Sequence, residues 1–150
     1  NLQDSKISVA VVVQAMIQSE VSGICFTVHP ITQDHDQIVI EAGWGLGEAI
    51  VGGMITPDAY VVNKKDWRIL DQNVNEQKIM IVQSETGNSE QSVPTQKRNK
   101  QKLSDEQIIE LAKLCQKIEE HYQYPQDIEW AFADSKMYIV QSRPITTLES

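Results

Sequence analysis

The sequence has few of the features that mark secreted, membrane or nucleic-acid-binding proteins. Its two cysteines, Cys25 and Cys115, lie far apart in apolar surroundings. They are expected to be reduced core residues of a cytoplasmic protein, not a disulfide or a metal site. No apolar run approaches the length of a membrane-spanning helix, and no signal peptide opens the chain. The formal net charge of −8 argues against a nucleic-acid or anionic membrane partner.

Several catalytic motifs are also missing. Residues 43–47 read GWGLG, a G-x-G-x-G spacing, whereas dinucleotide-binding folds use G-x-G-x-x-G, so we reject a Rossmann site. The serines have no evident histidine and aspartate partners for a hydrolase triad. The histidines His29, His35 and His121 are expected at surface or turn positions.

The 150 residues are enough for one ordinary domain with its own core. Short apolar or alternating stretches predict strands, and a glycine-bearing turn predicts the start of a short helix. Strands are expected over residues 7–16, 23–28, 37–42, 59–63, 67–70 and 78–82, and the short helix over residues 48–51. The polar stretch 84–102 is rich in Gln, Ser, Asn and Lys and is expected to be a solvent-exposed connection.

A single long helix is expected to begin after Ser104. Ser104 and Gln107 have the spacing of a capping box, and the helix should end before Pro125. Apolar residues recur at helical spacing and predict a stripe that packs on the core. They are Ile108, Leu111, Ala112, Cys115 and Ile118. Mixed strands with few helices predict an α+β domain with a mainly antiparallel sheet.

The last two predicted strands form a C-terminal β-hairpin and carry the side chains with the most chemistry. Asp127 and Glu129 share one face of the first strand, because strand side chains alternate with period two. Gln141 and Arg143 share one face of the second strand in the same way. A carboxylate beside an amide oxygen suits Mg²⁺, and a guanidinium two residues along matches a phosphate. The pattern predicts a metal–phosphate site, although an ordinary hairpin with a surface Asp–Arg pair would show the same alternation.

The apolar residues predict the register of this hairpin. In that register Ala133 faces Met137. It places Glu129 opposite Gln141, and Asp127 opposite Arg143. The other face then collects an apolar core surface made of Ile128, Trp130, Phe132, Tyr138 and Val140. A slip by one residue would bury the amide and the guanidinium among these side chains, which is unfavourable.

Three stretches of the chain, in order, resemble one known family. They are VVVQAMIQSEVSGICFTVHPIT, EAGWGLGEAIVGGMITPDAYVV and DIEWAFADSKMYIVQSRPITTL. Together they resemble the ATP-binding domain of the phosphoenolpyruvate synthase and pyruvate phosphate dikinase family, from Val9 to Leu148. Rifampicin phosphotransferases share this domain. The resemblance implies an ATP-grasp fold, in which two α+β lobes hold ATP, with residues 1–150 as the C-terminal part of the domain in a larger multidomain enzyme.

The resemblance also implies roles for the hairpin residues. Glu129 matches a metal-ligating glutamate, and Gln141 matches a second position that contacts metal or phosphate. Arg143 matches the phosphate-binding arginine of the QSRP motif. These three residues are the predicted catalytic set, and Mg²⁺ is the predicted metal. Asp127 is expected either to ligate the metal or to orient Arg143.

Further nucleotide contacts are implied outside the hairpin. Gln14 lies at the end of a buried strand, where the adenine edge would meet backbone groups. Met16 is expected either to pack on the adenine or to fill the core. Glu48, in the GLGE turn, is expected either to approach the nucleotide or its metal or to begin a helix.

The family reaction, as implied by the resemblance, begins when ATP phosphorylates a histidine on a mobile domain. That histidine then phosphorylates pyruvate, and AMP and phosphate are released. The other ATP-grasp lobe and the phosphohistidine domain would be partners of this chain, which alone would be an incomplete site. The alternatives are a rifampicin phosphotransferase-like enzyme and a binding module that holds ATP without turnover.

Overall fold

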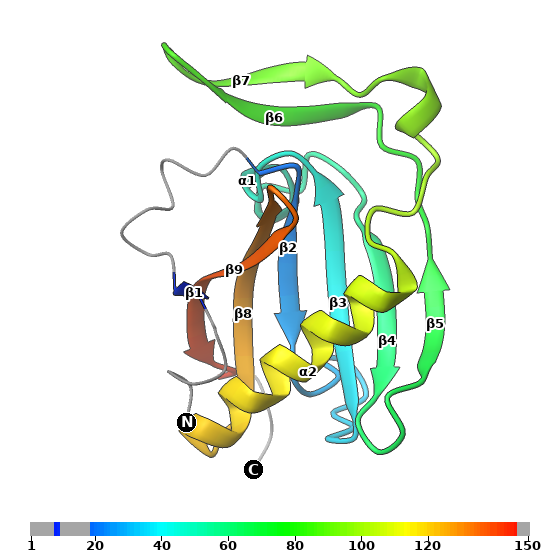
Figure 1. The fold of residues 1–150 in the computed structure, drawn as a ribbon, viewed down its shortest axis with the longest axis vertical. Helices are drawn as coiled ribbons and strands as arrows, with labels where there is room; N and C mark the ends of the chain where they lie inside the picture. Colours follow the sequence, from blue (N-terminus) through cyan, green and yellow to red (C-terminus); the bar gives the residue numbers. More distant parts are fainter. Residues whose placement is uncertain (1–7, 10–18, 147–150) are drawn as a thin grey trace.

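The computed structural model describes residues 8–9 and 19–146, and the structural statements below concern these residues (Figure 1). The strands are β1 (Ser8–Val9), β2 (Val21–Phe26), β3 (Gln37–Trp44), β4 (Asp58–Asn63), β5 (Ile69–Asn73), β6 (Ile79–Ser84), β7 (Gly87–Ser92), β8 (Gln126–Ala133) and β9 (Lys136–Pro144). The helices are α1 (Glu48–Val51), α2 (Asp105–Tyr122) and the short 3₁₀ helix η3 (Thr95–Lys97).

Seven of the strands form one sheet in the order β1-β9-β8-β2-β3-β4-β5, and β6 and β7 form a separate ribbon. β1 runs parallel to β9, whereas all other neighbouring strands are antiparallel. The predicted α+β class, with a mainly antiparallel sheet, one long helix and a C-terminal hairpin, is therefore confirmed.

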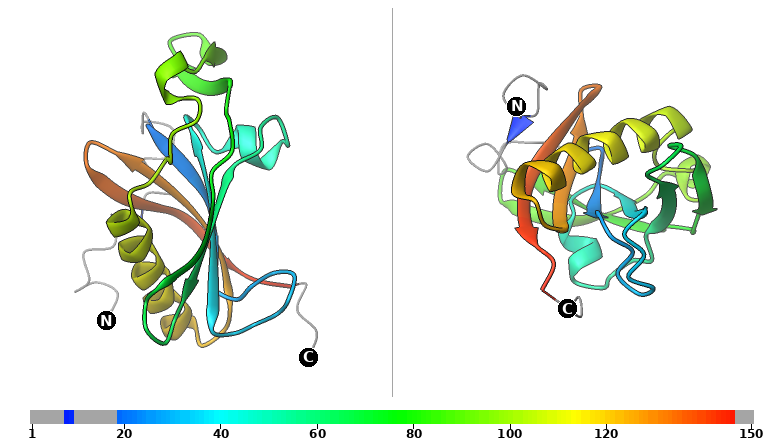
Figure 2. Two further views of the ribbon diagram at one scale, coloured as in Figure 1. Left: turned by 90° about the vertical axis from the view of Figure 1, so that its right-hand side faces the viewer. Right: turned by 90° about the horizontal axis from the view of Figure 1, so that it is seen from below.

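The two faces of the sheet are covered differently. α2 crosses one face, whereas α1 and the connection between β2 and β3 lie on the other side (Figure 2). The core lies between α2 and the sheet. Its buried members are Val21, Cys25, Ile38, Ile40, Ala42, Tyr60, Val62, Leu103, Ile108, Leu111, Ala112, Cys115, Ile118, Ile128, Trp130 and Ile139. Both cysteines are free and buried, as predicted. No helix in the described part of the chain is long and apolar enough to span a membrane.

The long helix begins and ends as the sequence predicts. The Ser104 hydroxyl accepts from the backbone N–H of Gln107, and the Gln107 side chain accepts from the backbone N–H of Ser104. This capping box satisfies two backbone donors that the first turn leaves unpaired. After Tyr122, Gln123 adopts a left-handed conformation that ends the helix. All five residues of the predicted apolar stripe are buried.

One predicted strand lies mostly outside the described residues, and another differs from the structure. The strand expected over residues 7–16 lies mostly outside the described residues, which include only β1 of it. Trp67 was expected to begin a strand, but its φ of 58° places it in the turn before β5. Its ring packs against the core, so burial and not strand formation explains an aromatic residue at this position.

The prediction for residues 84–102 was wrong in part. The stretch contains β7, which pairs with β6 in a ribbon that extends past the end of the main sheet (Figure 1). All residues of β7 are exposed, so the polarity was a correct sign of exposure. Residues 87–92 show no alternating apolar pattern because neither face of this strand packs on a core.

A buried ion pair joins the end of this stretch to the sheet. Lys102 Nζ lies 2.7 Å from Asp58 Oδ1, and both side chains are fully buried. Lys102 Nζ also donates to the backbone oxygen of Asn75 at 2.9 Å. Tyr60 donates its hydroxyl to Asp58 Oδ2 at 2.7 Å; burial and this carboxylate raise the pKa of Tyr60, which keeps the donor protonated. The network holds the segment that enters α2 against β4.

The C-terminal hairpin has the predicted register at its polar end. Glu129 pairs with Gln141, and Asp127 pairs with Arg143. Near the turn the prediction was wrong by one residue, because Ala133 pairs with Lys136. The two residues between them, Asp134 and Ser135, have φ values of 52° and 61°, the backbone that a two-residue hairpin turn requires.

A β-bulge in β9 reconciles the two ends of the hairpin. Trp130 pairs with Ile139 and Glu129 with Gln141, so Val140 between them has no partner on β8. Consequently Ile139 and Met137 contribute to the core cluster. The sequence pattern had predicted Val140 and Tyr138 on this face, which was wrong. Tyr138 instead pairs with Ala131 and lies on the face of Glu129.

Candidate functional site

The site is built on the sheet face opposite α2. One row across this face, from β9 to β3, consists of Gln141, Glu129, Ile24 and Glu41. The next row begins with Arg143 and Asp127 on the same two strands. Side chains in a row stand side by side because paired residues point to the same face. The structure therefore brings together the four polar hairpin residues that the sequence singled out.

Glu129 and Gln141 offer two oxygen ligands from adjacent strands. Glu129 is half-buried and Gln141 is exposed, so both side chains can reach a ligand on the open face. No group of three or more His, Cys, Asp or Glu side chains in the described part of the chain is arranged to hold a metal ion. A carboxylate with an amide oxygen still fits Mg²⁺, which commonly takes one or two protein ligands and completes its shell with water and phosphate oxygens.

Arg143 lies at the edge of this pair, with most of its guanidinium free. Its Nε donates to Asp127 Oδ2 across a long contact of 3.4 Å, and the Arg143 side chain is 63% exposed against 21% for Asp127. An exposed ion pair of this length contributes little to stability. The contact favours Asp127 as the residue that orients Arg143, which leaves the other guanidinium N–H groups available to a phosphate.

Glu41 is a functional candidate that our sequence analysis missed. It lies half-buried on β3, in the row of Glu129 and separated from it by Ile24. Burial, and to a lesser degree the charge of Asp127, raise the pKa of the Glu41 carboxyl. The signal in the sequence was the alternation of β3, where Ile38, Ile40 and Ala42 form the core face and Glu41 interrupts the other.

Glu48 is exposed at the start of α1, away from the hairpin pair. β3 ends at Trp44, which is in a row with Val21 and Phe132. This row is three residues farther along β3 than the row of Glu41, and α1 follows this end of the strand. The geometry matches the expected role as the first residue of a helix, and it does not place Glu48 beside Glu129. Gln14 and Met16 lie outside the described residues.

α1 covers one end of the open face. A Cβ atom at Gly43 would lie 2.8 Å from Ile55 Cδ1 and 3.2 Å from Ile50 Cδ1, so the glycine lets these side chains approach the sheet. Gly45 has a φ of 83°, and a Cβ there would lie 2.5 Å from the backbone oxygen of Ile81. The glycines of GWGLG therefore allow a strand-to-helix turn to pass close beneath the β6–β7 ribbon.

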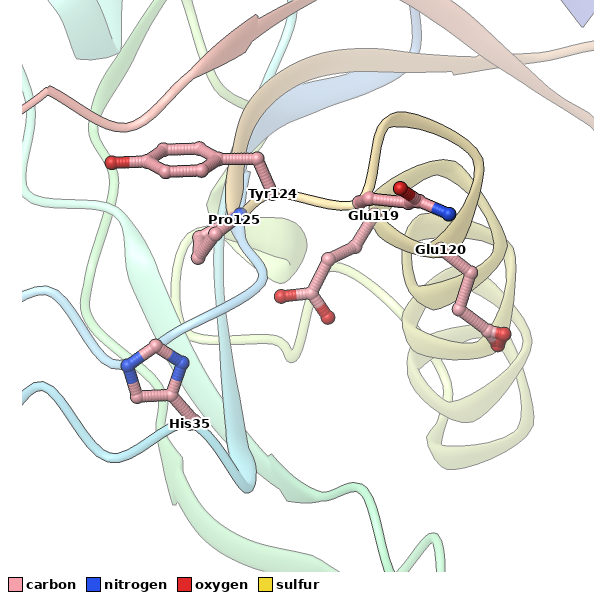
Figure 3. A pocket seen from close by; sticks show the side chains of 6 residues that line it. His35, Glu119, Glu120, Tyr124 and Pro125 are labelled. Carbon is pink, nitrogen blue, oxygen red and sulfur yellow. The ribbon is translucent and has the colours of Figure 1, made fainter.

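A hollow of about 340 Å³ lies at the C-terminal end of α2. Its lining residues are His35, Glu119, Glu120, Gln123, Tyr124 and Pro125. The Glu119 carboxylate points into it, whereas Glu120 points away from His35 (Figure 3). Glu119 is already engaged, because it accepts from Lys64 Nζ at 2.7 Å and from the Thr27 hydroxyl at 3.2 Å. The carboxylate that points into this hollow therefore already has a structural role.

Comparison with known proteins gives this geometry a context. The family model described as pyruvate phosphate dikinase, AMP/ATP-binding domain, matches residues 1–150. The chain belongs to this family. It is 49% identical to a phosphoenolpyruvate synthase of Pyrococcus furiosus over 97% of its length, and 43% identical to a rifampicin phosphotransferase of Bacillus subtilis over 96%.

The aligned segment is a minor part of each of these relatives. It covers 19% of the Pyrococcus furiosus protein and 16% of the Bacillus subtilis protein. A probable phosphoenolpyruvate synthase of Methanocaldococcus jannaschii is 46% identical over 96% of the chain, which covers 12% of that protein. Membership of the AMP/ATP-binding domain family thus describes this segment, and the chemistry of the relatives resides in longer polypeptides.

Proposed function

We propose that this chain is the part of an ATP-binding domain that holds the metal and phosphates of Mg-ATP, within a phosphotransferase resembling phosphoenolpyruvate synthase. Glu129 and Gln141 would ligate Mg²⁺, and Arg143 would bind phosphate oxygens while Asp127 orients it. When bound, Mg²⁺ would neutralise charge on the transferred phosphoryl group. The chain would contribute positioning and charge neutralisation, without supplying a nucleophile.

The register of the C-terminal hairpin carries this proposal. It places a carboxylate opposite an amide and a carboxylate opposite a guanidinium on the sheet face opposite α2. A hairpin with only a structural role would not need an amide opposite Glu129. The match of the whole chain to an AMP/ATP-binding domain favours a nucleotide as the ligand.

We propose that residues 1–150 form the C-terminal part of the domain in a longer cytoplasmic chain. A second ATP-grasp lobe would cover the open face, with Gln14, Met16 and Glu48 as additional nucleotide contacts. A mobile domain would carry the histidine that receives phosphoryl groups from ATP and passes one to pyruvate. The partial coverage of the relatives supports further domains.

The similarity to the Bacillus subtilis relative supports a second candidate, a rifampicin phosphotransferase-like enzyme. It would use the same ATP site with a different final acceptor. A module that binds ATP without turnover is disfavoured, because the metal pair and the arginine are both present and paired. The three candidates differ in whether ATP is turned over and in which molecule is the final phosphoryl acceptor, so an experiment can separate them.

The test uses the full polypeptide that contains this chain. AMP formation from Mg-ATP is measured with pyruvate, with rifampicin and with neither acceptor, for the wild type and for Glu129→Gln. Pyruvate-dependent AMP formation that is lost in the variant would support the main proposal, and rifampicin dependence would support the second candidate. Tight Mg-ATP binding without AMP formation under any condition would overturn both in favour of a binding module.

A further inference from the structure

A third carboxylate shares the open face with the proposed metal pair. Glu41 lies two strands from Glu129, with Ile24 between them, which corresponds to about 10 Å between their backbones at the usual strand spacing. Magnesium–oxygen bonds are only about 2.1 Å long. Glu41 therefore lies beside the proposed metal site, on the side away from Arg143.

Among the described residues, the charges around Glu41 disfavour an anionic ligand on this side. β2, β3, β4 and β5 contain no lysine or arginine, and neither do the connecting residues 27–36 and 45–57. The three cations of the β4–β5 turn are paired elsewhere, Lys64 with Glu119, Lys65 with Asp36 and Arg68 with Asp66. Phosphates would be attracted to Arg143 and repelled by Glu41, so the group facing Glu41 should be neutral or cationic.

Glu41 is also a carboxylate without a partner among the described residues. Within the described residues it has no ion pair or hydrogen bond, and the effects that shift its pKa are burial and the like charge of Asp127. A half-buried carboxylate in this state is costly unless it accepts hydrogen bonds. An incoming N–H donor would meet that need.

We propose that Glu41 accepts a hydrogen bond from the Nδ1–H of the imidazole that receives the phosphoryl group, and so orients Nε2 toward the phosphorus atom. This rests on the proposed function, in which a histidine is the first acceptor. The Nε2–P bond forms as the P–O bond to the departing nucleotide breaks, and the electron pair remains on that oxygen. The proton stays on Nδ1, where the Glu41 carboxylate stabilises the positive charge that develops on the ring.

The test measures phosphoryl transfer and nucleotide binding separately in the full polypeptide. Glu41→Gln and Glu41→Ala are compared with the wild type in single-turnover labelling by radioactive Mg-ATP, and Mg-ATP affinity is measured by calorimetry. We expect transfer to fall by about 10²–10⁴-fold, the usual range for a lost acid–base or orienting group, with affinity changed less than about threefold. Formate should partly restore transfer in Glu41→Ala, because it can replace the missing carboxylate.

Asp71→Asn is the matched control. Asp71 is exposed on β5 and pairs with Val61 on β4, so this variant removes a charge from the same side of the sheet without touching the site; it should transfer normally. Normal transfer in both Glu41 variants would overturn the inference, and so would a parallel loss of Mg-ATP affinity, which would place Glu41 on the nucleotide. If the wild type itself forms no phosphohistidine, the proposed function fails first.

Discussion

The two faces of the main sheet use the same strands for opposite purposes. On the α2 side, Ile128 and Trp130 of β8 are buried in the core. On the open side, Asp127 and Glu129 of the same strand face Arg143 and Gln141. Because neighbouring residues alternate between the faces, the residues that stabilise the core and those of the proposed site lie one position apart. A substitution should therefore affect folding or function, depending on its position in the alternation.

Polar groups occur on both faces, and their surroundings distinguish them. Asp58 and Lys102 on the helix side are fully buried and pair at 2.7 Å. Asp127 and Arg143 on the open side pair at 3.4 Å and are partly solvated. The first pair has no capacity left for a ligand, whereas the second is loose enough to exchange its contact for a phosphate.

The largest expected effect is on the helix side. Asp58→Ala should lower the free energy of unfolding by about 3–5 kcal/mol, because it leaves the Lys102 ammonium buried without a counter-charge. Urea denaturation followed by tryptophan fluorescence measures this. The double variant Asp58→Ala/Lys102→Met should recover part of the loss; equal stability of the single variant and the wild type would show that the pair is not buried in solution.

Glu129→Gln should give the complementary result on the open side. The change is nearly isosteric, so stability should remain within about 0.5 kcal/mol of the wild type, whereas turnover of the full enzyme should fall on the order of 10²–10³-fold. Steady-state kinetics at limiting Mg²⁺ provide the measurement. Trp130→Ala, one residue along, should instead lose about 3–5 kcal/mol of stability. Full turnover in Glu129→Gln would refute the metal role.

Arg143→Lys should produce a smaller but still large loss of turnover. Lysine keeps the charge but cannot make the forked contact to phosphate oxygens, and one charge-assisted hydrogen bond contributes roughly 1.5–3 kcal/mol, or about 10- to 100-fold in rate. The thermal midpoint should stay unchanged, since the side chain is mostly exposed. Wild-type kinetics would mean that Arg143 is only a surface partner of Asp127.

Ser104→Ala should have the smallest effect of the series. It removes the hydroxyl that accepts from Gln107 N at 3.1 Å, and loss of an N-cap typically costs about 1 kcal/mol. Chemical denaturation should detect this loss, while Mg-ATP affinity of the full enzyme stays the same. Ser104→Asp, which can still cap the helix, should retain wild-type stability.

The elements that were predicted well are those whose sequence pattern and packing agree. The stripe from Ile108 to Ile118 and the capping box identified α2, and the polar pairing of the hairpin followed from burial of Trp130. β7 was missed because its residues pack on nothing. Glu41 was missed because its proposed role depends on β2 lying between β8 and β3, a long-range arrangement that local alternation does not contain.

The unpaired Val140 has a consequence for how this hairpin tolerates changes in length. Side chains along a strand point to the two faces with a period of two residues. An insertion of two residues near Asp134 would therefore leave Gln141 on the same face as Glu129. A single-residue insertion or deletion would turn the amide toward α2, unless a second bulge compensated for it. Homologous hairpins that keep this pair should therefore vary in turn length by even numbers, or vary by odd numbers together with gain or loss of the bulge.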